Sequence, residues 1–265
     1  MNFIPHFLWT GDMLTSEQQA FEHYVRQLLQ KYHGKRILPF SYEGKAFWLK
    51  QPEQVRGIWR VLKPYPRKAF RQEIAALRYF AEHRAPVPEM VLCGEDFFVL
   101  RDSGRSIGSA LNDETVPQTL KDQMLDDGAR ALAQLHRQGL VHGRPALRDM
   151  LWDNGRVSFI DFESGWVKTD SDKVLIRRKV RDNLIFIHSL GRTAGLSDER
   201  MLTLLERYFE DCEPQIKRAT FATVHRYRGL YTILRPFNAV AKTDLIAIYR
   251  LFETMRKLAS QEAIK

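Results

Sequence analysis

The stretch 140–163 places His142, Arg144, Asp149 and Asp161 around one tight turn. Asn154-Gly155 suits a two-residue hairpin loop, because both residue types readily take positive φ. We therefore predict a hairpin that brings Asp149 and Asp161, twelve positions apart, to face each other. Two carboxylates held this close repel unless a proton or a divalent cation lies between them. The spacing therefore predicts either a cation site or a perturbed carboxyl.

This pattern resembles the catalytic centre of the protein-kinase-like superfamily. Its catalytic loop reads His-x-Asp, four residues and Asn, followed by a hairpin and Asp-Phe-Gly. His142 matches the histidine, and Asp161-Phe162-Glu163 stands where Asp-Phe-Gly would be. Glu163 stands in place of a glycine that small-molecule kinases of the superfamily often replace. Two departures matter more: Arg144 replaces the catalytic Asp, and Asp149 replaces the metal-binding Asn. The resemblance places His142, Arg144 and Asp149 in the catalytic loop and makes Asp149 and Asp161 the expected Mg²⁺ ligands.

A second register also satisfies part of the family pattern. Asp149 and Asn154 together fit Asp-x-x-x-x-Asn, with Asp149 in the place of the base. This register would leave only six residues between Asn154 and Asp161 and would use the hairpin turn as a metal ligand. We prefer the first register, in which no residue fills the place of the base.

Upstream, Lys50 ends an apolar strand, and Glu73 lies on an amphipathic helix predicted over 70–80. In the family, a strand lysine paired with a helix glutamate holds the α- and β-phosphates of ATP. Taken singly, each residue would more often be a solvated surface charge. Their order along the chain, ahead of the hairpin, favours the functional interpretation. The family's glycine-rich phosphate loop is absent, since Gly34 and Gly44 are isolated.

Hydrophobic periodicity predicts the elements that position these residues. Strands are expected at 36–42, 45–50, 90–93 and 97–100, and helices at 16–32, 118–137, 198–209, 221–233 and 242–258, with another beginning at 180. His136 is expected to complement the dipole at the end of its helix. Asp182, expected at the head of the helix from 180, resembles the aspartate that braces the family's catalytic loop.

The resemblance implies an α+β, bilobal protein-kinase-like fold. An N-terminal lobe over 1–101 would hold the first helix, a small antiparallel sheet and one further helix. A C-terminal helical lobe over 102–265 would carry the catalytic hairpin.

Composition bounds the compartment and the partners. The chain has 265 residues, a net charge of +9 and two cysteines, too few for a disulfide framework or a zinc site. No apolar run approaches the ~18 residues that span a bilayer, and the first residues do not form a signal peptide. We therefore expect a cytoplasmic protein. The charge predicts attraction to a nucleotide, a nucleic acid or an anionic membrane surface, or else a basic solvated surface without a partner.

Within the superfamily, the residues from about Lys45 to Tyr208 resemble small bacterial lipopolysaccharide core kinases. Those enzymes phosphorylate sugars of a nascent glycolipid at the inner face of the membrane. The resemblance implies an ATP- and Mg²⁺-dependent phosphotransferase acting on such a sugar or a similar acceptor, peripheral to that membrane face. Because Arg144 replaces the base, the alternative is a pseudokinase, a nucleotide-binding regulatory module without turnover. Nucleic-acid binding by the basic C-terminal helices is a weaker hypothesis, because the sequence contains no known motif for the recognition of nucleic-acid bases.

Overall fold

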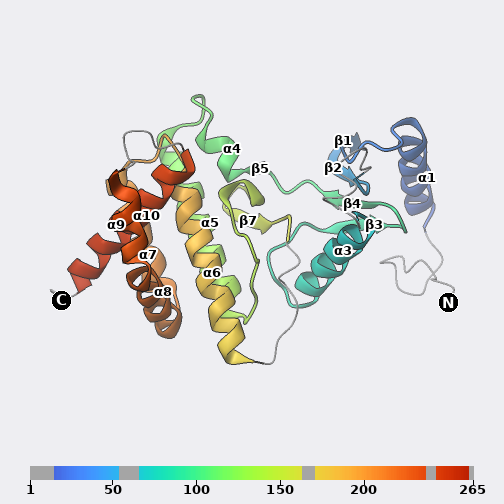
Figure 1. Ribbon diagram of the computed structural model, residues 1–265. Coiled ribbons are helices and arrows are strands. Elements are labelled where there is room, and N and C mark those ends of the chain that lie inside the picture. The colour runs from blue at the N-terminus through green and yellow to red at the C-terminus, as the bar shows by residue number, and fades with distance from the viewer. Residues whose placement is uncertain (1–14, 54–65, 163–170, 237–242, 263–265) are drawn as a thin grey trace. The chain divides into compact units, whose positions relative to one another are not determined.

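The computed structural model describes residues 15–53, 66–162, 171–236 and 243–262 (Figure 1). The chain divides into two compact units, Met1–Ser103 and Gly104–Lys265. The boundary predicted from the sequence, between 101 and 102, lies two residues before this division. The fold is α+β, as predicted, with a small antiparallel sheet in the first unit and a mostly helical second unit. No helix of the described ranges is long and apolar enough to cross a membrane.

The first unit is a four-stranded antiparallel sheet in the order β1-β2-β4-β3, with two helices. The elements are α1 (Ser16–Lys31), β1 (Ile37–Tyr42), β2 (Lys45–Lys50), α3 (Pro66–Glu82), β3 (Met90–Cys93) and β4 (Phe98–Arg101). The four predicted strands are therefore confirmed, and the predicted helix over 70–80 begins four residues earlier. Thr15 caps α1 through a capping box with Gln18, which fixes where that helix starts.

The alternation of side chains along β2 decides which residues face which helix, since successive side chains point to opposite faces of a sheet. Phe47 and Leu49 are buried in the core cluster that includes Val25 of α1. Lys50 consequently points to the other face, where its partner residue Phe98 stacks on Phe70 of α3, with ring centroids 5.2 Å apart. The period of the strand thus turns Lys50 toward α3.

The second unit combines a three-stranded sheet, in the order β5-β6-β7, with a set of helices. Its elements are β5 (Arg105–Ser106), α4 (Ile107–Leu111), α5 (Gln118–Arg137), the 3₁₀ turn η1 (Leu147–Asp149), β6 (Met150–Asp153), β7 (Arg156–Phe159), α6 (Asp172–Gly191), α7 (Asp198–Asp211), α8 (Pro214–Arg226), α9 (Arg228–Leu234) and α10 (Thr243–Glu262). Fully buried side chains of α5, β6, β7, α6 and α7 form its core, among them Leu132, Met150, Phe159, Phe186 and Leu205.

Two helix predictions need correction. The helix expected to begin at 180 begins at Asp172, so Asp182 lies in its middle and not at its head. The basic residues before 180 lack the apolar periodicity from which the helix was predicted. One of them, Lys179, is nevertheless buried, because it pairs with Glu213. The helix expected over 221–233 is two helices, α8 and α9, separated at Tyr227, whose φ and ψ are −90° and 8°. The predicted start of the last helix, 242, lies outside the described residues.

The predicted hairpin is confirmed. Asn154 and Gly155 have φ of 46° and 87°, and β6 pairs with β7 from Asp153↔Arg156 to Met150↔Phe159. Beyond the strands, the N–H of Ile160 donates to the carbonyl oxygen of Asp149 at 3.0 Å. This last hydrogen bond fixes the base of the hairpin, the end at which both predicted carboxylates lie.

Candidate functional site

Both carboxylates at the hairpin base meet the same guanidinium group. Arg144 Nη2 lies 3.0 Å from Asp161 Oδ2 and 4.0 Å from Asp149 Oδ2. The prediction that the two aspartates face each other is therefore confirmed, and Arg144 supplies the positive charge that such a pair requires. The three predicted site residues form one cluster in the second unit. Glu163, the last residue of the predicted Asp-Phe-Glu motif, lies outside the described residues.

Asp149 is the most enclosed member of this cluster, with 5% of its surface exposed. Its Oδ2 has no hydrogen-bond partner among the described residues, and Arg148 Nε lies 3.6 Å from its Oδ1. Burial, with the added charge of Asp161, raises the pKa of Asp149 to about 6, against the opposing pull of Arg148 and Arg144. A buried carboxylate oxygen facing a second carboxylate has the chemistry of a cation ligand.

Asp161 is more accessible, and its backbone is strained. Its side chain is 43% exposed, and its φ is 60°. The left-handed region costs an L-residue roughly 1–2 kcal/mol, although Asp tolerates it better than most. The strain turns the chain as it leaves β7 and keeps the carboxylate beside Arg144. Residues held in this way concentrate at functional sites.

His142 holds the loop rather than a substrate. Its ring is fully buried; Nε2–H donates to the carbonyl of Ile160 at 3.0 Å, and Nδ1 accepts from the N–H of Arg144 at 3.3 Å. Burial lowers the pKa of His142 to about 4, so the neutral form is retained. Both ring nitrogens are occupied, so His142, which the sequence placed among the catalytic residues, is a positioning residue that ties Arg144 to the end of the hairpin.

Asp182 of α6 fixes the loop that contains His142, Gly143 and Arg144, and is called the brace below. This carboxylate is fully buried and accepts the N–H groups of His142 at 2.8 Å and of Gly143 at 3.0 Å. Gly143 has a φ of 95°, which a residue with a side chain would adopt only under strain. The predicted bracing of the loop by Asp182 is confirmed by these hydrogen bonds.

His136 lies in the last turn of α5, where it was expected. This residue is 3% exposed, and its Nε2 lies 3.3 Å from Asp182 Oδ2. It therefore also connects the end of α5 to Asp182, a contact that the sequence did not predict. Its position six residues before His142 was a signal for this role, because a loop that returns to one buried carboxylate can bring both histidines to it.

The alternative register for the metal ligands does not fit the geometry. Asn154 lies in the turn at the tip of the hairpin and is exposed, whereas Asp161 lies beyond its base. At about 3.3 Å per residue, the strand between them separates the two by roughly 20 Å. Asn154 and Asp161 cannot share one metal ion. The first register, by contrast, has both of its predicted metal ligands, Asp149 and Asp161, at the same end of the hairpin.

In the first unit, Lys50 and Glu73 form an ion pair, as expected. Both side chains are mostly buried, and Lys50 Nζ lies 5.8 Å from the centroid of the Phe98 ring. The pair connects the end of β2 to α3. Its predicted role in holding nucleotide phosphates stays a prediction.

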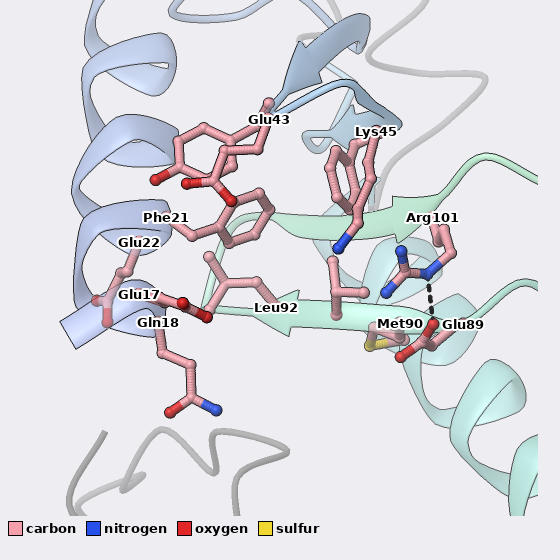
Figure 2. Close-up of a pocket in the computed structure, with 13 residues that line it drawn as sticks. Glu17, Gln18, Phe21, Glu22, Glu43, Lys45, Glu89, Met90, Leu92 and Arg101 are labelled. Atoms are coloured by element: carbon pink, nitrogen blue, oxygen red, sulfur yellow. Dashed lines mark hydrogen bonds and ion pairs between the residues drawn. The ribbon is translucent and has the colours of Figure 1, made fainter. Parts of the chain in front are cut away.

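A groove of about 320 Å³ lies elsewhere in the first unit, between α1 and the sheet (Figure 2). Its lining includes Phe47 and Glu43 of the β1–β2 hairpin, and Arg101, whose Nε donates to Glu89 at 2.6 Å. It opens on the face of the sheet opposite to Lys50. The groove and the Lys50–Glu73 pair are therefore separate features.

No protein-family model matches the chain. An uncharacterized protein of Haemophilus influenzae is 42% identical to it over 233 residues, which are 88% of this chain and 95% of that protein. The chain belongs to that protein's family. Because the match covers 88% of this chain, it includes residues of both units and not the hairpin alone.

The brace leads to a stability prediction. Asp182→Asn would place an amide N–H₂ against one of the two backbone N–H donors and remove a buried charge. Hydrogen bonds to charged groups contribute about 1.5–3 kcal/mol each, so we expect the free energy of unfolding to fall by about 3 kcal/mol. Urea denaturation measures this, and Asp153→Asn on the exposed hairpin is the control. Hydrogen exchange at the His142 and Gly143 amides should accelerate in the first variant alone; unchanged exchange there would contradict the bracing role.

A second prediction concerns pH. The pKa of Asp149 is higher in the fold, at about 6, than in an unfolded chain, so its contribution to stability is present at low pH and lost as pH rises through about 6. Asp149→Asn should match wild type near pH 4 and exceed it by up to about 3 kcal/mol near pH 8, in urea with EDTA. His142 titrates in both proteins, so the difference between them isolates Asp149. A difference that stays constant with pH would contradict the assignment.

Proposed function

We propose that this chain is an ATP-dependent phosphotransferase with a protein-kinase-like fold. The observation that carries the proposal is the cluster of Asp149, Arg144 and Asp161 at the base of a hairpin whose loop is braced from behind. A buried carboxylate whose Oδ2 has no hydrogen-bond partner among the described residues, a strained carboxylate and a guanidinium would be costly to keep for structure alone.

The residues that would bind nucleotide are Lys50 and Glu73. A lysine held by a carboxylate at the end of a strand has the form of a phosphate anchor. The acceptor would be a sugar of lipopolysaccharide core or a similar glycolipid, as the sequence resemblance implies. The protein would then act in the cytoplasm, at the inner face of the membrane.

The aspartates fit a magnesium ion, which would be held by Asp149 and Asp161. In nucleotide sites Mg²⁺ is usually bound by one or two carboxylates together with phosphates. Among the described residues, no group of three or more His, Cys, Asp or Glu side chains could hold a metal ion, so phosphate oxygens of a bound nucleotide would have to complete the ligand set. When bound, the ion would neutralise phosphate charge.

Arg144 sets the rate that such an enzyme could reach. A guanidinium cannot accept a proton, so it cannot act as the base, and the loss of a base costs about 10²- to 10⁴-fold. Phosphoryl transfer has a loose transition state and depends mainly on positioning and charge, so an arginine beside the transferred phosphoryl group would recover part of this loss. We therefore favour a slow phosphotransferase.

One observation favours the second candidate, a pseudokinase. Arg144 donates to Asp161 at 3.0 Å, which places a fixed positive charge beside the proposed metal ligands. If this ion pair persists with nucleotide bound, the site binds without turnover.

The nucleotide site is tested through Lys50. Lys50→Met should weaken ATP binding about 10- to 100-fold, the loss expected for a charge-assisted contact of about 1.5–3 kcal/mol. The double variant Lys50→Met/Glu73→Gln removes the whole pair and avoids leaving an unpaired carboxylate. Lys45→Met, on the same strand but facing the α1 side, is the matched control. Isothermal titration with ATP and Mg²⁺ measures the affinities. Equal affinity in all four proteins would contradict the assignment of the nucleotide site to Lys50 and Glu73.

The choice between enzyme and pseudokinase is tested through Arg144. If the guanidinium assists transfer, Arg144→Ala should lower ATP turnover by about 10²-fold or more while Mg²⁺ affinity holds. Arg156→Ala, an exposed arginine on the same hairpin, is the control and should change neither quantity. Tighter Mg²⁺ binding in Arg144→Ala, with no turnover in either protein, would instead identify the pseudokinase.

A further inference from the structure

The short helix α9 exposes apolar side chains that the described part of the chain does not cover. None of its residues is buried. Tyr227, just before it, is 55% exposed, Leu230 is 48% exposed and Ile233 is 68% exposed. Leu230 and Ile233, three apart, lie on the same side of α9, and together with Tyr227 at its N-cap they are called the apolar ridge below. Ile233 is the most exposed of the large apolar side chains in the described residues.

The ridge is held in place from its other side. Tyr231 stacks on Phe252 of α10, with ring centroids 5.4 Å apart, and its hydroxyl donates to Glu253. The hydroxyl of Tyr249 donates to the carbonyl of Leu234. These contacts fix α9 against α10, beside which it lies in Figure 1. Leu230 and Ile233 are therefore presented outward by a supported helix.

The surroundings of the ridge are basic. From Pro214 to Arg235 the chain has five Lys and Arg residues and no Asp or Glu. Three of these, Arg226, Arg228 and Arg235, flank the ridge and are exposed. The sequence analysis weighed nucleic-acid binding for these helices, but the exposed aliphatic side chains require an apolar partner as well as an anionic one.

We propose that the apolar ridge, together with the three arginines that flank it, docks on the surface of an anionic phospholipid bilayer. Lipid head groups supply phosphate and carboxylate to the arginines, and the layer beneath them accepts Leu230 and Ile233. A nucleic acid offers phosphates but no comparable apolar layer. A second copy of the chain would oppose two basic surfaces, which repel. The inference is independent of phosphoryl transfer.

The test is co-sedimentation with two kinds of vesicle, one of phosphatidylcholine alone and one containing about a third phosphatidylserine. Wild type should bind the anionic vesicles and lose them in high salt. Each basic residue near such a surface contributes roughly fivefold, so Arg226→Gln/Arg228→Gln/Arg235→Gln should weaken binding about a hundredfold. The control Arg36→Gln/Arg84→Gln/Arg156→Gln removes the same net charge from other exposed positions and should change binding far less.

The apolar contribution is tested separately. Leu230→Ser/Ile233→Ser should weaken vesicle binding about tenfold or more at unchanged net charge, whereas Ile37→Ser, at a residue of the first unit that is 43% exposed, should not. The proposal is overturned if wild type fails to bind the anionic vesicles, or if the two triple Arg→Gln variants lose vesicle affinity to the same extent. It is also overturned if an oligonucleotide binds tightly and the serine variant binds it equally well, or if sedimentation shows self-association that the serine variant abolishes. ATP affinity should be the same in all these variants, so failure here leaves the nucleotide site untouched.

Discussion

The site in the second unit depends on one buried carboxylate, that of Asp182. It accepts the backbone N–H groups of His142 and Gly143 and contacts the ring of His136. A buried carboxylate without such donors would cost several kcal/mol, so the loop and the brace stabilise each other. Because α5 supplies His136 and α6 supplies Asp182, the loop is fixed to two helices of the core. The distances within the cluster follow from this arrangement.

The neutral imidazole of His142 connects the loop that Asp182 fixes to the end of the hairpin. One ring nitrogen accepts from the N–H of Arg144 and the other donates to the carbonyl of Ile160. The residue before Asp161 and the residue that meets its carboxylate are thus tied to the same side chain. This explains how a loop without regular structure keeps a guanidinium within hydrogen-bond distance of Asp161.

The parts of the structure that followed from the sequence were those with local signals. Asn154-Gly155 marked the turn, and strand alternation turned Lys50 toward α3, where Glu73 meets it. What could not be predicted required tertiary contacts. Lys179 is basic but buried, because Glu213 pairs with it across two helices, and so the start of α6 was placed too late. The ridge on α9 has the periodicity of a core helix, and only the packing of α10 shows which of its sides is covered.

Asp149 and Asp161 together argue that the hairpin base is more than a structural joint. A joint would be better served by glycine or asparagine at position 161, where φ is 60°, and by an apolar residue at the buried position 149. Both positions instead carry aspartate, and the guanidinium that reaches both still leaves Asp149 Oδ2 without a hydrogen bond among the described residues. The cluster holds two negative charges against one shared arginine, with Arg148 more distant. Such an arrangement is poised to accept further positive charge, which a structural joint would not require.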